Sequence, residues 1–306
     1  MAKRSNSIKM SMGEKIFQTF NTLLLTLLGI STLYPMIYIL VVSLNEGQDS
    51  MKGGLFLWPR VFTLFNYQFV LGNGLIQNAY MITIGRTVLG TILGIALTAF
   101  VAYGLSFRNL PYKKFILFLM LIPMLFNGGL IPYYLQLNRL KLINTFWVYV
   151  IPGLFNIWNM FVMRRFFMDI PESLRESAII DGANEVVVLF RIILPLSLPM
   201  LAALSLFTAV GHWNDWFSGA FYVNDNKLIP VQTYLQRLLS ADSLSMIFGN
   251  NRMIGEAAFR QTQVSKMTVT SIKMAAVMIG TLPILCLYPF LQKYFIKGVL
   301  IGSIKE

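Results

Sequence analysis

The sequence predicts an all-α integral membrane protein, and three of its features support that prediction. The chain of 306 residues is 56% hydrophobic and only 12% charged, whereas ordinary soluble domains are about 25% charged. Its mean hydropathy is +0.63. Long apolar runs recur along the chain, each near the ~20 residues that a helix needs to cross a bilayer. This amount of charge is too small to cover the surface of a soluble protein of this length.

Six apolar runs predict six transmembrane helices. Their approximate bounds are Phe17–Leu44, Ala79–Phe107, Phe115–Leu137, Thr145–Phe167, Leu196–Tyr222 and Val269–Phe295. Prolines interrupt several of these runs, which membrane helices tolerate when neighbouring groups satisfy the freed carbonyls. The first run is longer than the ~7–15 apolar residues of a secretion signal, and no small-residue cleavage site follows it. We therefore expect it to be a span.

Basic residues are distributed unevenly between the two sides that six spans would define. Fourteen Lys and Arg lie in the N-terminal segment, the 107–114 loop, the 164–195 loop and the C-terminal segment, and nine lie in the loops of the other side. Because cytoplasmic loops carry the excess of Lys and Arg, both termini are expected in the cytoplasm. The net charge of +12 falls between apolar runs, so it does not indicate a nucleic-acid partner.

The sequence offers no metal or catalytic cluster. Cys286 is the only cysteine, which excludes an intrachain disulfide framework and a cysteine metal site. His212 is the only histidine, and no Cys or carboxylate cluster accompanies it. We expect both side chains to serve in packing.

A charged, helix-forming segment at residues 168–195 interrupts the apolar background. Asp169 is placed to cap a helix, with Glu172 completing a capping box. Gly182 is placed to end that helix in a left-handed conformation. Ala183–Phe190 is predicted to form a second short helix that ends, just before the fifth span, at Leu194 and Pro195.

The break between these two helices combines small and charged residues. The small ones are Ser177, Ala178, Gly182 and Ala183, and the charges that flank them are Arg175, Glu176, Asp181 and Glu185. Small side chains allow another backbone to approach closely. The pattern therefore predicts a docking surface.

This segment resembles the cytoplasmic EAA loop of ABC-importer permeases, whose pattern is Glu-Ala-Ala, three residues, Gly, nine residues, Ile, any residue, Leu-Pro. The chain has Glu176, Ser177, Ala178, Gly182, Ile192, Leu194 and Pro195 at these positions, and only Ser177 departs from the pattern. Residue frequencies alone produce such a match in about one window per million. The whole chain resembles the smaller, six-helix permease of the maltose-type carbohydrate-uptake group. The stretches HWNDWFSGAFY and LYPFLQKYFIKGVLIGSIKE are similar to its oligosaccharide branch.

The resemblance implies the type I ABC-importer permease fold, with six transmembrane helices and an EAA coupling loop. It implies a pore made with a second permease subunit, as a heterodimer, and two cytoplasmic ATPase subunits that each receive one loop in a cleft. The coupling-loop residues would be Arg175, Glu176, Ser177, Ala178, Asp181, Gly182, Ala183, Leu194 and Pro195, with Glu176 and Gly182 the most sensitive. An extracellular solute-binding protein would deliver a carbohydrate, an oligosaccharide or polysaccharide fragment, for alternating-access transport.

The same resemblance divides the chain and places it in the bacterial cytoplasmic membrane. Residues 1–15 would be a cytoplasmic tail, and residues 16–78 the first span with its extracytoplasmic loop. Residues 79–295 would be the transmembrane core, with the coupling loop at 168–195 and an extracytoplasmic loop at 223–268, and residues 296–306 a cytoplasmic tail. No Gly-x-x-x-x-Gly-Lys-Ser/Thr loop is present, so ATP and Mg²⁺ are expected on the ATPase partners and no cofactor on this chain.

Asp215 is the one acid within a predicted span, and an intramembrane ionisable residue indicates function by default. One interpretation is a substrate pathway of Trp213, Asn214, Asp215 and Trp216, in which the indoles stack on sugar rings. The alternative is the interfacial end of the fifth span, where Asp215 holds helices together. Arg86, in the second span, either snorkels to the surface or forms a gate or a salt bridge between subunits.

A channel or an ion-coupled carrier without an ATPase partner is the alternative function. Such carriers normally need several intramembrane acids or broken-helix ion sites. A membrane-embedded enzyme would need paired carboxylates, a Ser/His pair or metal ligands, and the spans supply none of these. The chain is therefore predicted to be a transport subunit and not an enzyme. Its outer segment Phe56–Phe69 either meets the binding protein or covers the bundle.

Overall fold

The computed structural model describes residues 11–55, 57–72, 74–240 and 268–303. Within these ranges every regular element is a helix, and the one pairing of extended backbone is an isolated bridge between Asn45 and Phe62. The predicted all-α class is therefore confirmed. Phe56, most of the predicted 223–268 loop and the outermost terminal residues lie outside the described residues. The chain forms two compact units, residues 1–70 with 243–278 and residues 71–242 with 279–306.

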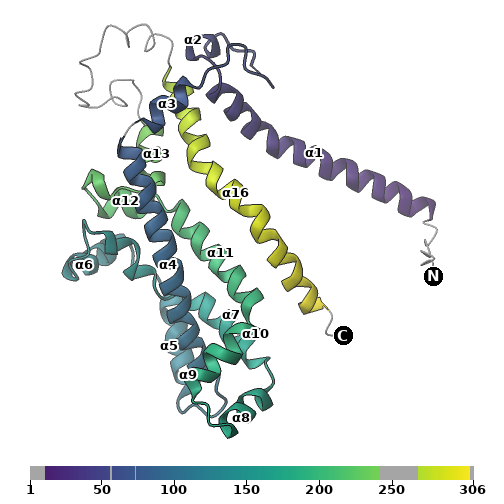
Figure 1. The fold of residues 1–306 in the computed structure, drawn as a ribbon, viewed down its shortest axis with the longest axis vertical. Helices are drawn as coiled ribbons and strands as arrows, with labels where there is room; N and C mark the ends of the chain where they lie inside the picture. Colours follow the sequence, from purple (N-terminus) through teal and green to yellow (C-terminus); the bar gives the residue numbers. More distant parts are fainter. Residues whose placement is uncertain (1–10, 56, 73, 241–267, 304–306) are drawn as a thin grey trace. The chain divides into compact units, whose positions relative to one another are not determined.

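Three helices among the described residues are long and apolar enough to cross a membrane (Figure 1). They are α1 (Met12–Ser43), α4 (Gly74–Ser106) and α16 (Val269–Ser303). Three further candidates are bent pairs, and the count rises to six if each pair is one span. The pairs are α5 (Lys113–Leu125) with α6 (Leu130–Arg139), η1 (Phe146–Tyr149) and η2 (Ile151–Gly153) with α7 (Ile157–Met168), and Glu185–Leu196 with α11 (Leu198–Asn214).

The predicted third span, Phe115–Leu137, is not one continuous helix. Its two parts meet at an angle of 113°, because the Asn-Gly-Gly stretch at 127–129 ends α5 and Gly129 takes a positive φ of 87°. Only glycine adopts that conformation readily. The apolar composition predicted burial in a membrane but did not reveal this fold-back.

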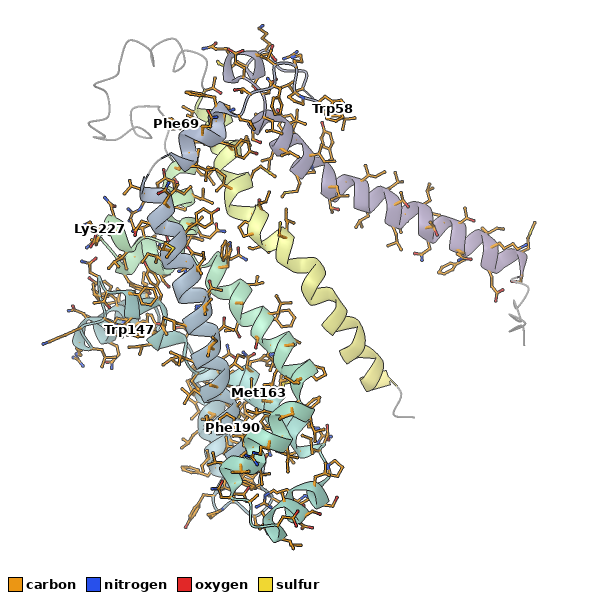
Figure 2. All side chains as sticks on the ribbon, in the orientation of Figure 1. Trp58, Phe69, Trp147, Met163, Phe190 and Lys227 are labelled. Carbon is orange, nitrogen blue, oxygen red and sulfur yellow. The ribbon has the colours of Figure 1, made fainter. Side chains whose placement is uncertain are left out.

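In the first unit, α1 leads into a compact loop with two short helices, α2 (Gly47–Ser50) and α3 (Phe65–Leu71). Asp49 holds this loop together. Its carboxylate accepts hydrogen bonds from the Asn45 amide at 3.1 Å and from the Arg60 guanidinium at 2.9 Å. The bond from Asn45, assisted by Arg60, holds the pKa of Asp49 below its usual value. Trp58 extends from the same loop with 82% of its surface exposed (Figure 2).

In the second unit, α4 is an unbroken helix of 33 residues that packs against α7 and α11. Small residues allow this close approach. A Cβ atom on Gly90 would fall 2.4 Å from the His212 ring, and one on Gly94 would fall 3.5 Å from the Leu154 carbonyl oxygen. The predicted packing role of His212 agrees with this geometry.

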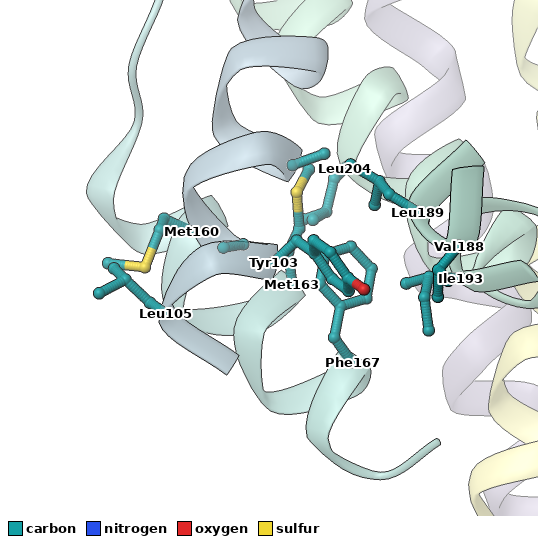
Figure 3. Packing of buried hydrophobic residues seen from close by; sticks show 11 residues of the cluster. Tyr103, Leu105, Met160, Met163, Phe167, Val188, Leu189, Ile193 and Leu204 are labelled. Atoms are coloured by element: carbon teal, nitrogen blue, oxygen red, sulfur yellow. The ribbon is translucent and has the colours of Figure 1, made fainter. Parts of the chain in front are cut away.

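A buried apolar cluster joins α4, α7 and α11 to the segment that follows α8 (Glu172–Ile180) (Figure 3). Its members are Ala99, Ala102, Tyr103, Leu105, Met160, Met163, Phe167, Val188, Leu189, Ile193 and Leu204. Figure 2 shows Met163 and Phe190 toward this end of the second unit and Lys227 toward the other. The cluster fixes the predicted coupling segment to the helix bundle.

The other end of the second unit carries α12 (Phe217–Tyr222), η4 (Asn226–Leu228) and α13 (Val231–Leu239). Two backbone contacts attach this end to the bundle: the Val231 amide donates to the Thr83 hydroxyl at 2.9 Å, and the Tyr149 hydroxyl donates to the Leu228 carbonyl at 2.9 Å.

Candidate functional site

The candidate site is the elbow, which we define as residues 171–197, from the start of α8 to the bend at Ser197. Pro171 precedes α8 and no side chain caps the helix. Asp169 belongs instead to the end of α7, where it pairs with Arg165 at 3.1 Å. The predicted capping box between Asp169 and Glu172 is therefore wrong, because the preceding helix continues far enough to use Asp169 itself.

Gly182 ends α8 as the sequence predicts. Its φ is +87°, the Gly182 amide donates to the Ile179 carbonyl at 2.9 Å, and the Ala183 amide donates to the Ala178 carbonyl at 2.9 Å. These two bonds form the Schellman motif, which requires a left-handed residue at this position. A Cβ on Gly182 would meet no atom within 4 Å, so the constraint there is backbone conformation and not space.

The second helix of the elbow runs further than predicted. Asn184 caps α9 (Glu185–Val188) by accepting from the Val187 amide at 2.9 Å, and a π turn, η3 (Leu189–Ile193), continues into α10 (Leu194–Leu196). The predicted end at Leu194 and Pro195 is wrong, since the helix continues through both. The π turn replaces the i→i+4 backbone hydrogen bonds of the α-helix by i→i+5 bonds just before Pro195. Pro195 has no backbone N–H to donate to the preceding turn.

The break before α11 lies at Ser197, where the two helical parts meet at 83°. The Ser197 hydroxyl is buried and donates to the Ile193 carbonyl at 2.7 Å. The same Ile193 carbonyl also accepts from the Ser197 amide at 3.1 Å, so two bonds hold the residue at the bend to the preceding helical turn.

One face of the elbow points inward onto α4. Glu185 accepts from the Arg175 Nε at 3.1 Å and from the Tyr103 hydroxyl at 2.6 Å, and the Arg175 guanidinium makes a second contact with the same carboxylate. The Arg175 guanidinium also lies over the Phe107 ring, 4.7 Å from its centroid. Arg175, predicted to flank the docking surface, therefore binds within the chain. Sequence reasoning missed Tyr103, and no local pattern signals it.

The opposite face of the elbow is exposed. Glu176, Ser177, Asp181 and Gly182 lie there, and Ile180 has 86% of its surface exposed. Within the described part of the chain, the carboxylates of Glu176 and Asp181 have no hydrogen-bond or ion-pair partner. Their neighbours Ala178 and Ala183 pack against the apolar cluster. The exposed face is therefore an isoleucine between two free acids, and sequence reasoning missed the isoleucine.

A second polar centre lies at the break between α11 and α12. Arg86 of α4 is fully buried and pairs with Asp215 at 3.3 Å, and it also donates to the Asp215 backbone carbonyl. The Asp215 carboxylate accepts from the Ser218 amide at 3.1 Å, and the Arg86 guanidinium lies 5.1 Å from the Tyr149 ring centroid. Arg86 therefore does not snorkel, and its counter-ion is in its own chain. This geometry agrees with the alternative in which Asp215 holds helices together.

The predicted substrate-pathway residues do not share one surface. Trp213 is 7% exposed, and its indole N–H donates to the Gly280 carbonyl at 3.2 Å, so in this conformation it offers no free face to a sugar ring. Asn214 and Trp216 are exposed, and their role stays a prediction. Among the described residues, no group of three or more His, Cys, Asp or Glu is placed to hold a metal.

Comparisons with known proteins cover nearly the whole chain. Residues 88–301 match the family described as the binding-protein-dependent transport system inner membrane component. The chain is 36% identical over 291 residues to protein LplC of Bacillus subtilis (strain 168), covering 95% of each. It is 33% identical over 294 residues to the polygalacturonan/rhamnogalacturonan transport system permease protein YtcP of the same strain, covering 96% of this chain and 100% of that one.

A solved structure agrees with these sequence matches. The chain superposes with a TM-score of 0.84 and 28% identity on a chain from the crystal structure of a bacterial ABC transporter involved in the import of the acidic polysaccharide alginate. The match covers 94% of this chain and 100% of that one.

Proposed function

The chain belongs to the family of binding-protein-dependent transport system inner membrane components, and on that basis we propose a carbohydrate as the cargo that it helps to import. It is a permease subunit of an ABC importer in the cell membrane and not itself an enzyme. The predicted family, fold class and transport function are thereby confirmed. The cargo proposed is an oligosaccharide or polysaccharide fragment, supported by the polysaccharides named for YtcP and for the alginate transporter.

The exposed face of the elbow is the proposed docking surface for a cytoplasmic ATPase. One observation carries this proposal: Gly182 breaks the helix so that Ile180, 86% exposed, stands beside the unpaired carboxylates of Glu176 and Asp181. Docking would remove the Ile180 side chain from water, and the acids would pair with cations of the partner. ATP and Mg²⁺ would be bound by the ATPase, and this chain would bind neither.

The elbow would convert closure of the ATPases into movement of the bundle. Its second helix runs directly into α11 through the bend at Ser197, so displacement of the docked face would reorient α11. The bundle would then open alternately toward each side of the membrane. An extracellular binding protein, as the family description implies, would deliver the carbohydrate to the outward-facing state.

Several finer features belong to the same proposal. The pore would form with a second, different permease subunit, and two ATPases would each receive one elbow. Both termini and the elbow would lie on the cytoplasmic side, and each bent pair would count as one span. The excess of basic residues on that side supports the orientation.

An ion-coupled carrier is disfavoured by the partner of Asp215. A carrier of that kind needs an intramembrane acid that is free to bind an ion or proton, whereas Asp215 already pairs with the fully buried Arg86 at 3.3 Å. The pair is consistent with a bundle driven by a separate motor.

Copurification and transport assays on the reconstituted complex test the docking surface. Glu176→Lys and Gly182→Asp should both abolish ATPase copurification and uptake, because one reverses an interface charge and the other strains the backbone at a φ of +87°. Glu172→Gln, on the same helix, is the matched control and should leave both intact. Survival of uptake and of substrate-stimulated ATP hydrolysis in both test variants would overturn the docking assignment. Uptake assays against a panel of glycans test the cargo.

A further inference from the structure

We propose that α4 is a strut that carries displacement of the elbow to the break between α11 and α12, with Tyr103 and Arg86 as its two positioning residues. The inference rests on the proposed docking of the elbow and deepens it. It assigns the transmission to a helix that the docking segment does not include. Figure 1 shows α4 running between the end with α8 and α9 and the end with α12 and α13.

The inner end of α4 is clamped to the elbow. The Glu185 carboxylate of α9 accepts from Arg175 of α8 and from the Tyr103 hydroxyl of α4, the latter at 2.6 Å. Hydrogen bonds to an ionised carboxylate are roughly twice as strong as neutral ones. Because one carboxylate joins all three helices, the elbow cannot tilt without either moving α4 or breaking these bonds.

Apolar packing supports this inner clamp. Val188, Leu189 and Ile193 of the elbow belong to the same buried cluster as Ala99, Ala102 and Tyr103 of α4 (Figure 3). Close-packed interiors transmit displacement because they compress little. The contact between elbow and α4 is therefore both polar and apolar.

The helix between the two clamps is uninterrupted. It has no proline, and the 17 residue steps from Arg86 to Tyr103 span about 26 Å at 1.5 Å per residue. The direct route from the elbow into α11 passes instead through a π turn and the 83° bend at Ser197. A bend absorbs part of any displacement, whereas a straight helix moves as one body.

The outer clamp lies where α11 ends. Asp215 leaves helical geometry, with a ψ of 103°, and starts α12 by accepting from the Ser218 amide. The buried Arg86 binds both its carboxylate and its backbone carbonyl. Removing the counter-ion of a buried charge is strongly destabilising, so Asp215 must follow Arg86 when α4 shifts. One turn earlier, Thr83 of α4 holds the Val231 amide that begins α13.

The test uses the complete reconstituted complex and the variant Tyr103→Phe, which keeps the ring and removes only the hydroxyl. ATPase copurification and basal ATP hydrolysis should stay within twofold of the parent protein. Substrate imported per ATP should fall about tenfold, the change expected from loss of a hydrogen bond to a charged group. Glu185→Gln, which removes the charge at the same clamp, should also lower the substrate imported per ATP. This second variant tests the clamp if Tyr103→Phe assembles poorly.

The matched control is Glu172→Gln. Glu172 pairs with Arg108 between the same two parts of the chain, but at 3.7 Å the contact is longer than a hydrogen bond, and the Arg108 side chain is 77% exposed whereas the Arg175 side chain of the clamp is 27% exposed. Exposed pairs contribute little, so this variant should keep import per ATP within twofold. An equal loss in the control and in Tyr103→Phe would overturn the assignment of the clamp.

A thiol label at the end of α4 away from the elbow distinguishes loss of transmission through α4 from a general loss of stability. The variant Ala220→Cys places a single thiol in α12 in a Cys286→Ser background. The rate at which this thiol is labelled is measured with and without trapping of the complex by ATP and vanadate. Trapping should change the labelling rate in the parent, and Tyr103→Phe should lose most of that change at an unaltered melting temperature. A full change in Tyr103→Phe refutes the strut. Absence of ATPase copurification in the parent refutes the docking proposal instead.

Discussion

Neutralising Asp215 should destabilise the protein far more than neutralising Arg86, although the two residues form one ion pair. The Arg86 side chain is 0% exposed and the Asp215 side chain is 32% exposed. Asp215→Asn therefore leaves a guanidinium without a counter-ion in the bundle, whereas Arg86→Met leaves a carboxylate that water still reaches. The Ser218 amide also continues to bond that carboxylate.

The magnitudes follow from what remains around each group. Breaking a buried pair by removing one partner typically destabilises by about 3–5 kcal/mol. Arg86 would keep its bond to the Asp215 backbone carbonyl and its contact with the Tyr149 ring, 5.1 Å away, so Asp215→Asn should cost about 3 kcal/mol, the low end of that range. Arg86→Met should cost about 1 kcal/mol, the scale of one lost hydrogen bond at a partly solvated group.

The double variant Arg86→Met with Asp215→Asn decides the matter. It removes the buried charge altogether, so its stability should return to nearly that of Arg86→Met, a coupling of about 3 kcal/mol, at the upper end of the range found for contacting residues. Fluorescence-detected melting of the purified protein in detergent measures the order of the three variants. Equal losses in the two single variants, or a double variant less stable than Asp215→Asn, would refute the reasoning.

Three further outcomes are expected from single features of the fold. Gly182→Ala should destabilise the elbow by about 1 kcal/mol, because alanine strains at positive φ, and hydrogen exchange at the amide of residue 183 should accelerate; unchanged exchange would contradict the Schellman motif. Gly90→Ala should lower the melting temperature through overpacking of about 1–3 kcal/mol against the His212 ring, and His212→Ala in the same chain should restore part of it; no restoration would mean that the ring is not the obstacle. The pKa of Asp49 is lowered, first by the bond from Asn45, so the ionised carboxylate stabilises the loop after α1 above the unfolded pKa of about 3.9, and that stability is lost as pH falls through the folded pKa. Pepsin cleavage of this loop between pH 2 and 5, corrected for pepsin's own pH profile, should rise with acidity in the parent and should not change with pH in Asp49→Asn. Parallel profiles for the two proteins would contradict this role of Asp49.

The sequence by itself determined the features that depend on neighbours along the chain. Apolar runs near the thickness of a bilayer located the long helices α1, α4 and α16, because the length of an apolar run is a property of the local sequence. The left-handed Gly182 followed from its place after a helix-forming stretch. Two local predictions were wrong. Asp169 ends α7 and does not cap α8, and the helix continues through Pro195 after the π turn instead of ending there.

Only the tertiary structure decided how the charged residues are paired. Tyr103 and Glu185 are separated by 82 positions, and Arg86 and Asp215 by 129. Hydrophobic periodicity shows which face of a helix is apolar. It does not identify the distant residue that will form the hydrogen bond or ion pair of a single polar side chain. The sequence therefore predicted Arg175 to be a charge at the docking surface, whereas in the structure it pairs with Glu185 of the same chain. The buried Arg86 needs a partner within the chain because the close packing of α4 on its neighbours excludes the water that would otherwise solvate it. The Glu185 carboxylate stays 42% exposed and is held by its bonds to Arg175 and Tyr103.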